Sequence, residues 1–327
     1  MNESSLKFVV ENGSVFDVCD FLEKGENPKE ADDIEVTLRW TITHGFTEVL
    51  QILLLYGADA TAALSLLAVE LGLEGVVSAL LKNGAKISTE NQFNRTLLHL
   101  AAMEGHESVV NLLLQNGAAV SAIDEWEDTP LHLAADAGHT RVTQILLEHG
   151  ADTSAENELN KTPLHLAIKG GHEEVALLLL QKGADTRTKN HRGWTPLHFA
   201  ADTGHHMMIR ELLQYGANIG AKNQLERTPL HLAAKGGHER ATQDLLANGA
   251  DIFARDKGGE TPLDIAHRNG HKRVGQILKL GAFTSVQNHQ ILGKGSSSNQ
   301  ETPVPMELGE LQSDLGQIMV HHKLPTI

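Results

Sequence analysis

Cysteine, aromatic residues and long apolar runs are all scarce in this sequence of 327 residues. The one cysteine, Cys19, excludes a disulfide within the chain and fits a reducing compartment. Aromatic residues make up 4% of the chain, which is little for one large globular core. No apolar run reaches the length of about 18 residues that a transmembrane helix needs, and no basic-then-apolar leader opens the sequence. We therefore expect a soluble protein of the cytoplasm or the nucleus.

Basic residues are also few, with 27 Lys and Arg against 42 Asp and Glu and a formal net charge of −15. The acid is concentrated near the start, since residues 1–90 hold 6 Lys and Arg against 15 Asp and Glu. A surface with this charge repels phosphate backbones and anionic lipid headgroups. The composition therefore argues against a nucleic-acid partner and against a membrane partner.

A seven-residue phrase, Thr-Pro-Leu-His-Leu-Ala-Ala at 129–135, returns along the chain in steps of 33 residues. A Gly-His pair and a Gly-Ala pair recur at the same step. Self-similarity at a fixed period is typical of repeat proteins, so we treat the chain as one stack of units. The threonine of the phrase recurs at Thr96, Thr129, Thr162, Thr195, Thr228 and Thr261.

In period and in the T-P-L-H signature, these phrases resemble the ankyrin repeat. The resemblance implies a mostly α fold, an ankyrin-repeat solenoid of about nine stacked helix-turn-helix pairs with β-hairpin or turn connectors. It also implies that the histidine of each phrase hydrogen-bonds between neighbouring backbone turns. These histidines are His99, His132, His165, His198 and His231.

Within one unit the residues themselves predict two short helices. The hydroxyl of Thr129 is expected to cap the first helix, which is worth about 1 kcal/mol, and Pro130 suits the first helical position. Gly138 is expected to end that helix and Gly150 the second. Helices this short are marginal alone, so their stability must come from the neighbouring units.

The chain divides into three parts on this reading. Residues 1–90 are predicted to form about three degenerate repeats that include an N-terminal cap, and residues 91–286 six regular repeats, the last of them a cap. Residues 287–327 leave the pattern and are predicted to hold a flexible linker and a short amphipathic helix at 306–321. That segment would fold back over the last repeat, stay disordered or dock on a partner.

No signature of catalysis or cofactor binding accompanies the repeats. There is no Gly-rich phosphate loop, no Gly-x-Ser-x-Gly, no Cys-x-x-Cys and no zinc-protease helix. The 19 histidines fall mostly into two columns set by the period, whereas a catalytic site needs unlike groups that converge. We therefore predict no enzyme, no cofactor, no metal ligands and no small-molecule substrate.

The first candidate surface is a row of residues near the connector tips, three positions before each threonine. Large apolar side chains and arginine are frequent there, and these types are enriched in binding hot spots. The alternative is that each side chain folds down and shields its own turn. We call these residues, with one tryptophan beside them, the tip row: Phe93, Trp126, Leu159, Arg192, Trp194 and Leu225.

The second candidate surface is the exposed end of each first helix, seven positions after the threonine. In stacks that resemble this one, this column and the tips line a concave groove. Its charges alternate, which suits a mixed polar partner or merely favours solubility. We call these residues the groove column: Met103, Asp136, Lys169, Asp202 and Lys235.

Four tips depart from the family pattern. A glycine commonly stands two positions before the threonine, but only Gly193 and Gly259 comply, and asparagine or glutamate occupies the other tips. Asparagine tolerates a left-handed turn, whereas glutamate does so poorly.

These features predict a non-enzymatic protein-protein interaction scaffold that binds a protein partner through the tip row and the groove column. The alternative is an adaptor or regulatory subunit, in which the repeats hold a target and the C-terminal tail recruits an enzyme. The identity of the partner does not follow from the residues.

Overall fold

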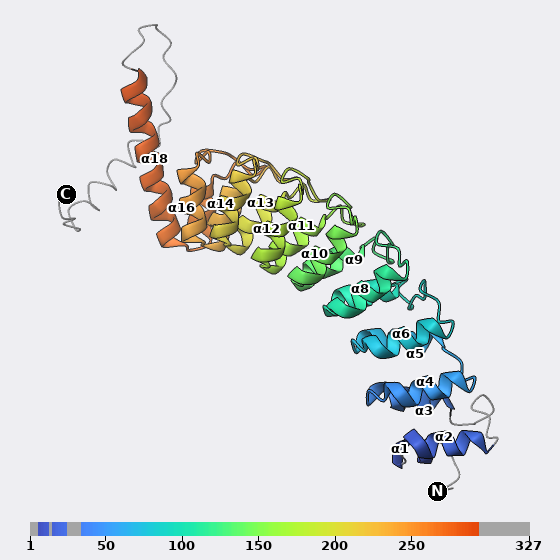
Figure 1. Cartoon of the computed structure of the whole chain (residues 1–327). Helices are drawn as coiled ribbons and strands as arrows, with labels where there is room; N and C mark the ends of the chain where they lie inside the picture. The colour runs from blue at the N-terminus through green and yellow to red at the C-terminus, as the bar shows by residue number, and fades with distance from the viewer. Residues whose placement is uncertain (1–5, 13–14, 25–33, 294–327) are drawn as a thin grey trace, which may run out of the picture. The chain divides into compact units, whose positions relative to one another are not determined.

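The computed structural model describes residues 6–12, 15–24 and 34–293 (Figure 1). The chain forms two compact units, residues 1–218 and 219–327. The described residues form eighteen helices and no strand, and their one isolated β-bridge joins Glu90 to Thr96. The connectors between the described helix pairs are therefore turns.

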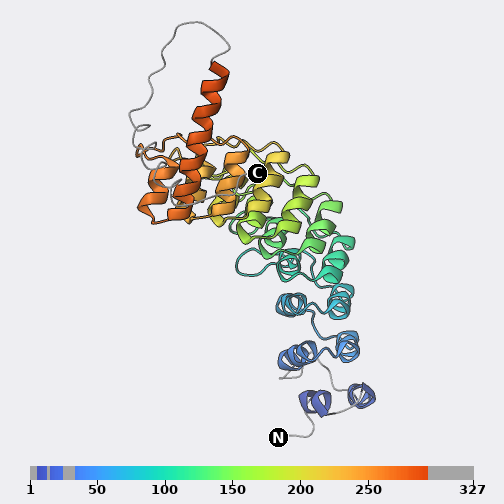
Figure 2. The ribbon, with the colours of Figure 1, turned by 90° about the vertical axis from the view of Figure 1, so that its left-hand side faces the viewer.

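In the first unit the helices form two rows, with the first helices of successive pairs in one row and the second helices in the other. Figure 2 shows the rows of the N-terminal pairs nearly end on. Thus α7 packs on α9 and α9 on α11, while α8 packs on α10 and α10 on α12. The helices of this unit are α1 Leu6–Asn12, α2 Val15–Glu23, α3 Ile34–Thr43, α4 Thr47–Leu55, α5 Ala62–Glu70, α6 Glu74–Lys82, α7 Leu97–Glu104, α8 Glu107–Gln115, α9 Pro130–Ala137, α10 Thr140–Glu148, α11 Pro163–Gly170, α12 Glu173–Gln181, α13 Pro196–Thr203 and α14 His206–Gln214.

The second unit continues the same alternation. In it α15 packs on α17, and α16 packs on α18. The last helix runs beyond residue 286, and residues 294–327, with the helix predicted at 306–321, lie outside the described residues. The helices are α15 Pro229–Gly236, α16 Glu239–Ala247, α17 Pro262–Arg268 and α18 Lys272–Gly293.

In the regular repeats the repeated phrase sets the start and the buried side of each first helix. In α9 the Thr129 hydroxyl accepts the His132 backbone N–H, and Pro130 occupies the first turn, where its missing N–H leaves no bond unmade. Leu131 and Ala134 are fully buried between the layers, so thin layers stack without aromatic side chains. The predicted fold class, a mostly helical repeat solenoid, is confirmed.

The glycine that ends α7 meets two requirements at once. Gly105 has a φ of 79°, a left-handed conformation that strains other residues. A Cβ atom there would also lie 2.6 Å from the ring of His139 in the next pair. That ring is held by its Nε2, which donates to Met103 O at 3.0 Å. The glycine therefore allows the turn and the close approach of the next repeat.

The connectors differ in length between the N-terminal pairs and the regular repeats. Residues 56–61 join α4 to α5, whereas the much longer segment 83–96 joins α6 to α7. Tips of the long connectors adopt left-handed conformations, with a φ of 60° at Glu127 and 57° at Glu226. Glutamate thus occupies a left-handed conformation, which costs residues other than glycine about 1 kcal/mol or more of free energy.

Candidate partner-binding surface

Each tip is shaped by an asparagine or aspartate five positions before the threonine, and this residue is buried in every repeat except the first, where Asn91 is half-buried. Asp124 Oδ1 accepts the backbone N–H groups of Trp126 and Asp128, both at 3.0 Å. This side-chain turn fixes the backbone on both sides of the tip-row residue. Our sequence-based expectations did not include this column of Asn and Asp residues, although their types recur in the sequence every 33 residues. Its members are Asn91, Asp124, Asn157, Asn190, Asn223 and Asp256.

The tip-row backbone also ties neighbouring connectors together. Glu125 N donates to Phe93 O at 3.1 Å, and Glu158 N donates to Trp126 O at 3.0 Å. The same bond joins His191 N to Leu159 O at 3.0 Å. Within the first unit the structure therefore holds Phe93, Trp126, Leu159 and the tip of Arg192 in adjacent positions along one line.

Three candidate side chains come together around Arg95. The rings of Phe93 and Trp126 lie with centroids 5.6 Å apart, and the Arg95 guanidinium carbon lies 4.9 Å from the Trp126 centroid. Arg95 Nη1 also lies 3.4 Å from the sulfur of Met103, a groove-column residue. We call Phe93, Arg95, Met103 and Trp126 the tip cluster. Sequence reasoning missed Arg95, because its contacts cross from one repeat to the next.

An ion pair with Asp124 fixes the guanidinium group of Arg95. Arg95 Nε donates to Asp124 Oδ2 at 3.0 Å, and the Asp124 side chain has no exposed surface. Because Arg95 is largely buried too, its charge is neutralised inside the cluster. What reaches solvent is mainly aromatic, since Phe93 is 37% exposed. The cluster is therefore a rigid, nearly neutral aromatic surface.

The other tip-row residues of the first unit are less alike. Leu159 is half-buried and Arg192 is exposed. Trp194 is half-buried with its ring 5.0 Å from that of Phe199, and its carbonyl accepts from His165 Nε2 at 3.2 Å. Trp194 thus contributes to the framework as well as to the surface.

In the groove column, the side chains reach solvent while the backbone is held. Asp136, Lys169 and Lys235 are exposed, whereas Met103 and Asp202 are half-buried. Histidines of the following repeats anchor two of the exposed positions, because His172 Nε2 donates to Asp136 O at 2.8 Å and His271 Nε2 to Lys235 O at 2.9 Å. The charges are therefore presented from fixed backbone points.

The histidine of the repeated phrase joins two neighbouring repeats. The backbone N–H of Thr96 donates to His99 Nδ1 at 3.2 Å, so Nδ1 carries no proton. The proton lies on Nε2, which donates to Asp128 O of the next connector at 3.0 Å. Both nitrogens of this neutral ring are used.

Burial holds these rings in the neutral form. It lowers the pKa of His165 to about 4, against hydrogen bonds to backbone groups that raise it. Burial likewise lowers the pKa values of His99, His132 and His231. A neutral ring bonded at both nitrogens is suited to bracing the stack and poorly suited to proton transfer.

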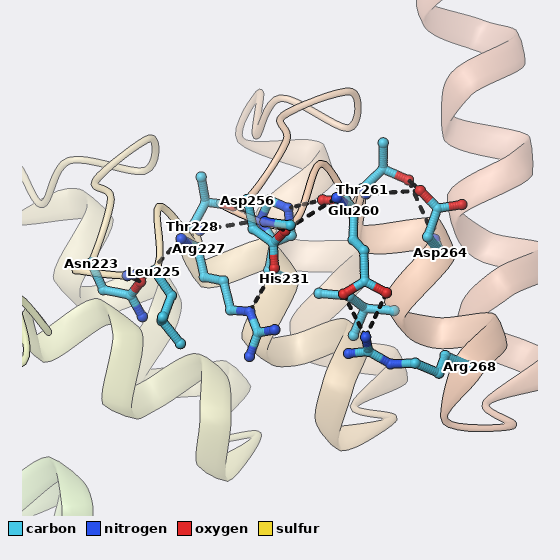
Figure 3. A network of polar contacts seen from close by, with 12 residues as sticks. Asn223, Leu225, Arg227, Thr228, His231, Asp256, Glu260, Thr261, Asp264 and Arg268 are labelled. Atoms are coloured by element: carbon cyan, nitrogen blue, oxygen red, sulfur yellow. Dashed lines mark hydrogen bonds and ion pairs between the residues drawn. The ribbon is translucent and has the colours of Figure 1, made fainter.

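The second unit carries the same tip arrangement (Figure 3). Asn223 Oδ1 accepts the backbone N–H groups of Leu225 and Arg227, at 2.9 and 3.0 Å. Arg227 Nε donates to Asp256 Oδ2 at 2.9 Å, as Arg95 does to Asp124. Leu225 is 51% exposed at this tip. In the last repeat Asp264 replaces histidine, and its Oδ2 accepts the Thr261 backbone N–H at 2.8 Å.

Among the described residues, no three His, Cys, Asp or Glu side chains lie together in a way that could hold a metal ion. No helix in the described ranges has the length and apolar character to cross a membrane.

Family models of one kind match most of the regular part of the chain. A model described as ankyrin repeats in three copies matches residues 65–157 and 154–223. A second, described as ankyrin repeats in many copies, matches residues 212–266. A search of curated proteins gave no match.

Proposed function

Because this chain belongs to the ankyrin-repeat family, whose repeats form protein-protein interaction domains, we propose that it is a non-enzymatic scaffold that binds a protein partner through its connector tips and groove column. The observation that carries the proposal is the tip cluster around Arg95. We further propose that the protein works in the cytoplasm or the nucleus, which its single, half-buried cysteine supports.

The tip cluster has the properties of a binding anchor. Phe93 and Trp126 are large, partly exposed rings whose backbone is fixed by Asx-type turns and by bonds between connectors. A rigid aromatic pair loses little conformational entropy when a partner covers it. Aromatic and arginine side chains in such settings contribute most to binding energy.

The groove column supports a partner of mixed charge. Asp136 and Lys169 are exposed at equivalent positions of consecutive repeats. A partner that places a basic and an acidic group at the spacing of one repeat would match both. Such rim charges contribute mainly to specificity and association rate.

A double substitution tests the tip cluster. Phe93→Ala with Trp126→Ala should weaken partner capture about tenfold or more, because both anchors are removed. The control is Phe253→Ala, which truncates another exposed connector ring, at 51% exposure, and should leave capture unchanged. Both proteins should keep the same far-UV circular dichroism. Equal capture by the double variant and the wild type, with intact helical signal, would contradict the proposal.

The adaptor role is the second candidate. The sequence at 306–321 carries Leu308, Leu311, Leu315 and Ile318 at helical spacing, outside the repeats. In an adaptor, a chain ending at residue 293 would lose one set of partners, whereas a scaffold acting through its repeats would keep them all. Comparing the proteins captured by the two chain lengths separates the roles.

A further inference from the structure

Two consecutive N-terminal helix pairs share an apolar surface. Its residues occupy the same three registers in each pair: five before, one before and one after the turn glycines Gly45 and Gly72. The helices that carry it, α3 and α5, pack against each other and are labelled in successive layers of Figure 1. We call this set the N-terminal apolar patch: Trp40, His44 and Phe46 from the first pair, and Leu67, Leu71 and Leu73 from the second.

Three rings of the patch form one stacked group. The centroids of Trp40 and His44 lie 4.2 Å apart, and those of Trp40 and Phe46 lie 5.3 Å apart, with interplanar angles of 25°. His44 Nδ1 lies 2.8 Å from Trp40 O, which fixes its ring on the helix end. Phe46 is 46% exposed and Leu71 44% exposed. The patch is therefore ordered and accessible.

The same registers look different in the regular repeats. Leu100, at the register of Trp40 and Leu67, is only 2% exposed, whereas Trp40 and Leu67 are half-buried. At the other two registers α7 and its turn carry Glu104 and His106, and His106 Nε2 donates to Glu70 O at 3.0 Å. Apolar residues at these positions cannot form that bond between repeats. Their presence is thus not explained by the stacking that explains the regular repeats.

A short connector leaves Trp40 of the patch open. The long connectors lie over the first helices of the preceding repeats, to which histidines such as His99 bond them. The segment 56–61, between α4 and α5, is too short to extend over α3 in this way. Trp40 consequently remains at the surface. Leu67 is half-buried as well although the long connector 83–96 follows its helix pair, so the short connector accounts for Trp40 alone.

Carboxylates border the patch. Glu48, Glu70 and Glu74 are exposed and lie within two positions of patch residues along the chain, and none of them has an ion-pair partner among the described residues. The basic residue next to Trp40 in the chain, Arg39, is engaged with Glu35, its Nε lying 3.4 Å from Glu35 Oε1. The surface therefore combines an apolar centre with an uncompensated negative rim.

We propose that the N-terminal apolar patch docks an amphipathic helix of a partner protein, with apolar residues against the rings and leucines and Lys or Arg residues against the glutamates. Helix-in-groove recognition uses apolar anchors at helical spacing, and rim charges of opposite sign guide the encounter. This second surface extends the proposed scaffold role and is separate from the tip cluster.

The glutamates of the rim favour a basic helix over two other occupants, a second copy of the chain and a membrane of anionic lipid. A second copy of the chain docked patch to patch would bring the same three glutamates of each copy together, which like-charge repulsion disfavours. A membrane surface of anionic lipid would be repelled by the same rim. A basic amphipathic helix satisfies the apolar centre and the rim together.

The test uses the full chain and a synthetic amphipathic peptide of about 18 residues, with Leu on one face and Lys on the other. Phe46→Ser with Leu71→Ser should weaken its binding about tenfold or more by removal of apolar anchors, as measured by calorimetry. Glu70→Lys with Glu74→Lys should weaken it by a similar factor at low salt and by less at high salt. A peptide with Glu in place of Lys should not bind the wild type.

Two matched controls keep the result interpretable. Glu173→Lys with Glu174→Lys makes the same change of net charge in a regular repeat, with Glu173 at the register of Glu74, and Leu55→Ser removes a 77% exposed leucine outside the patch. Both should bind the Lys peptide as the wild type does, and urea unfolding should show that all variants remain folded. Similar weakening by Glu70→Lys with Glu74→Lys and by Glu173→Lys with Glu174→Lys would mean that only net charge matters, and would overturn the proposal.

Other outcomes separate this proposal from the scaffold role. If Phe93→Ala with Trp126→Ala abolishes peptide binding and the patch variants do not, the patch proposal fails while the tip cluster stands. Loss of peptide binding in the patch variants alone supports the patch, whatever becomes of the tip cluster. Dimerisation of the chain, or its capture by phosphatidylserine vesicles, that Phe46→Ser abolishes without any peptide binding would also overturn the proposal.

Discussion

The helix pairs α3–α6 and the regular repeats α7–α14 stack in the same two rows. They differ in the burial of the residue five positions before the turn glycine. In the regular repeats a leucine such as Leu100 is buried there, and the phrase histidine bonds the next connector. In the N-terminal pairs Trp40 and Leu67 are half-buried, and Phe46 and Leu73 replace the second histidine. The N-terminal pairs thus lack both histidine columns, and only a short connector follows α4.

The largest expected effect is acid destabilisation of the regular repeats. The pKa of His165 is lowered to about 4 when folded, against about 6.5 when unfolded, so the unfolded chain binds the proton first. Stability should be fully present above about pH 6.5 and should fall as pH drops toward 4, by up to about 3 kcal/mol for this residue. Urea unfolding followed between pH 8 and pH 4 measures the change.

The N-terminal pairs provide the contrast in that experiment. The one histidine of residues 1–90, His44, is exposed, so these pairs contain no buried neutral ring to protonate. Hydrogen exchange read by segment should show α7–α12 losing protection between pH 6.5 and 4 more steeply than α3–α6. Equal losses in both segments would contradict this account.

The next effect compares two glycines in the same turn. Gly45 and Gly105 have φ values of 73° and 79°, but a Cβ at Gly45 meets nothing within 4 Å, whereas at Gly105 it meets His139 at 2.6 Å. Gly45→Ala should therefore cost about 1 kcal/mol, for the left-handed conformation alone. Gly105→Ala should cost about 1–3 kcal/mol more, for the clash.

Chemical denaturation of the two glycine variants measures that difference. If both alanines cost the same, the close contact of the second histidine column with the preceding turn contributes nothing to stability. The comparison between the two regions would then depend on connector length alone.

The smallest expected effect comes from backbone strain at the tips of the long connectors. Glu127 has a φ of 60°, so Glu127→Gly should stabilise the chain by about 1 kcal/mol, less the greater freedom of glycine in the unfolded state. Glu125→Gly, at a neighbouring exposed site without positive φ, should not stabilise it. A thermal shift assay of both variants is sufficient, and stabilisation by Glu125→Gly alone would refute the strain at Glu127.

Much of the framework was predictable because each requirement is local. The cap at Thr129, the proline after it and the glycine that ends the helix concern neighbouring backbone groups, and the period then repeats them. The turn-forming column represented by Asp124 was equally visible in the period but was missing from our expectations. The tip cluster was only half predictable, because Arg95 contacts Trp126 across two repeats.

The sequence by itself determined the ankyrin-repeat fold, its period and the candidate rows of surface residues, because local capping and stacking preferences recur in every unit. The tertiary structure decided which of those residues meet. It brought Phe93, Arg95, Met103 and Trp126 into one cluster, and it left Trp40 and Phe46 uncovered beside a short connector. Burial depends on what the neighbouring repeat places over a side chain, and that is a property of the stack.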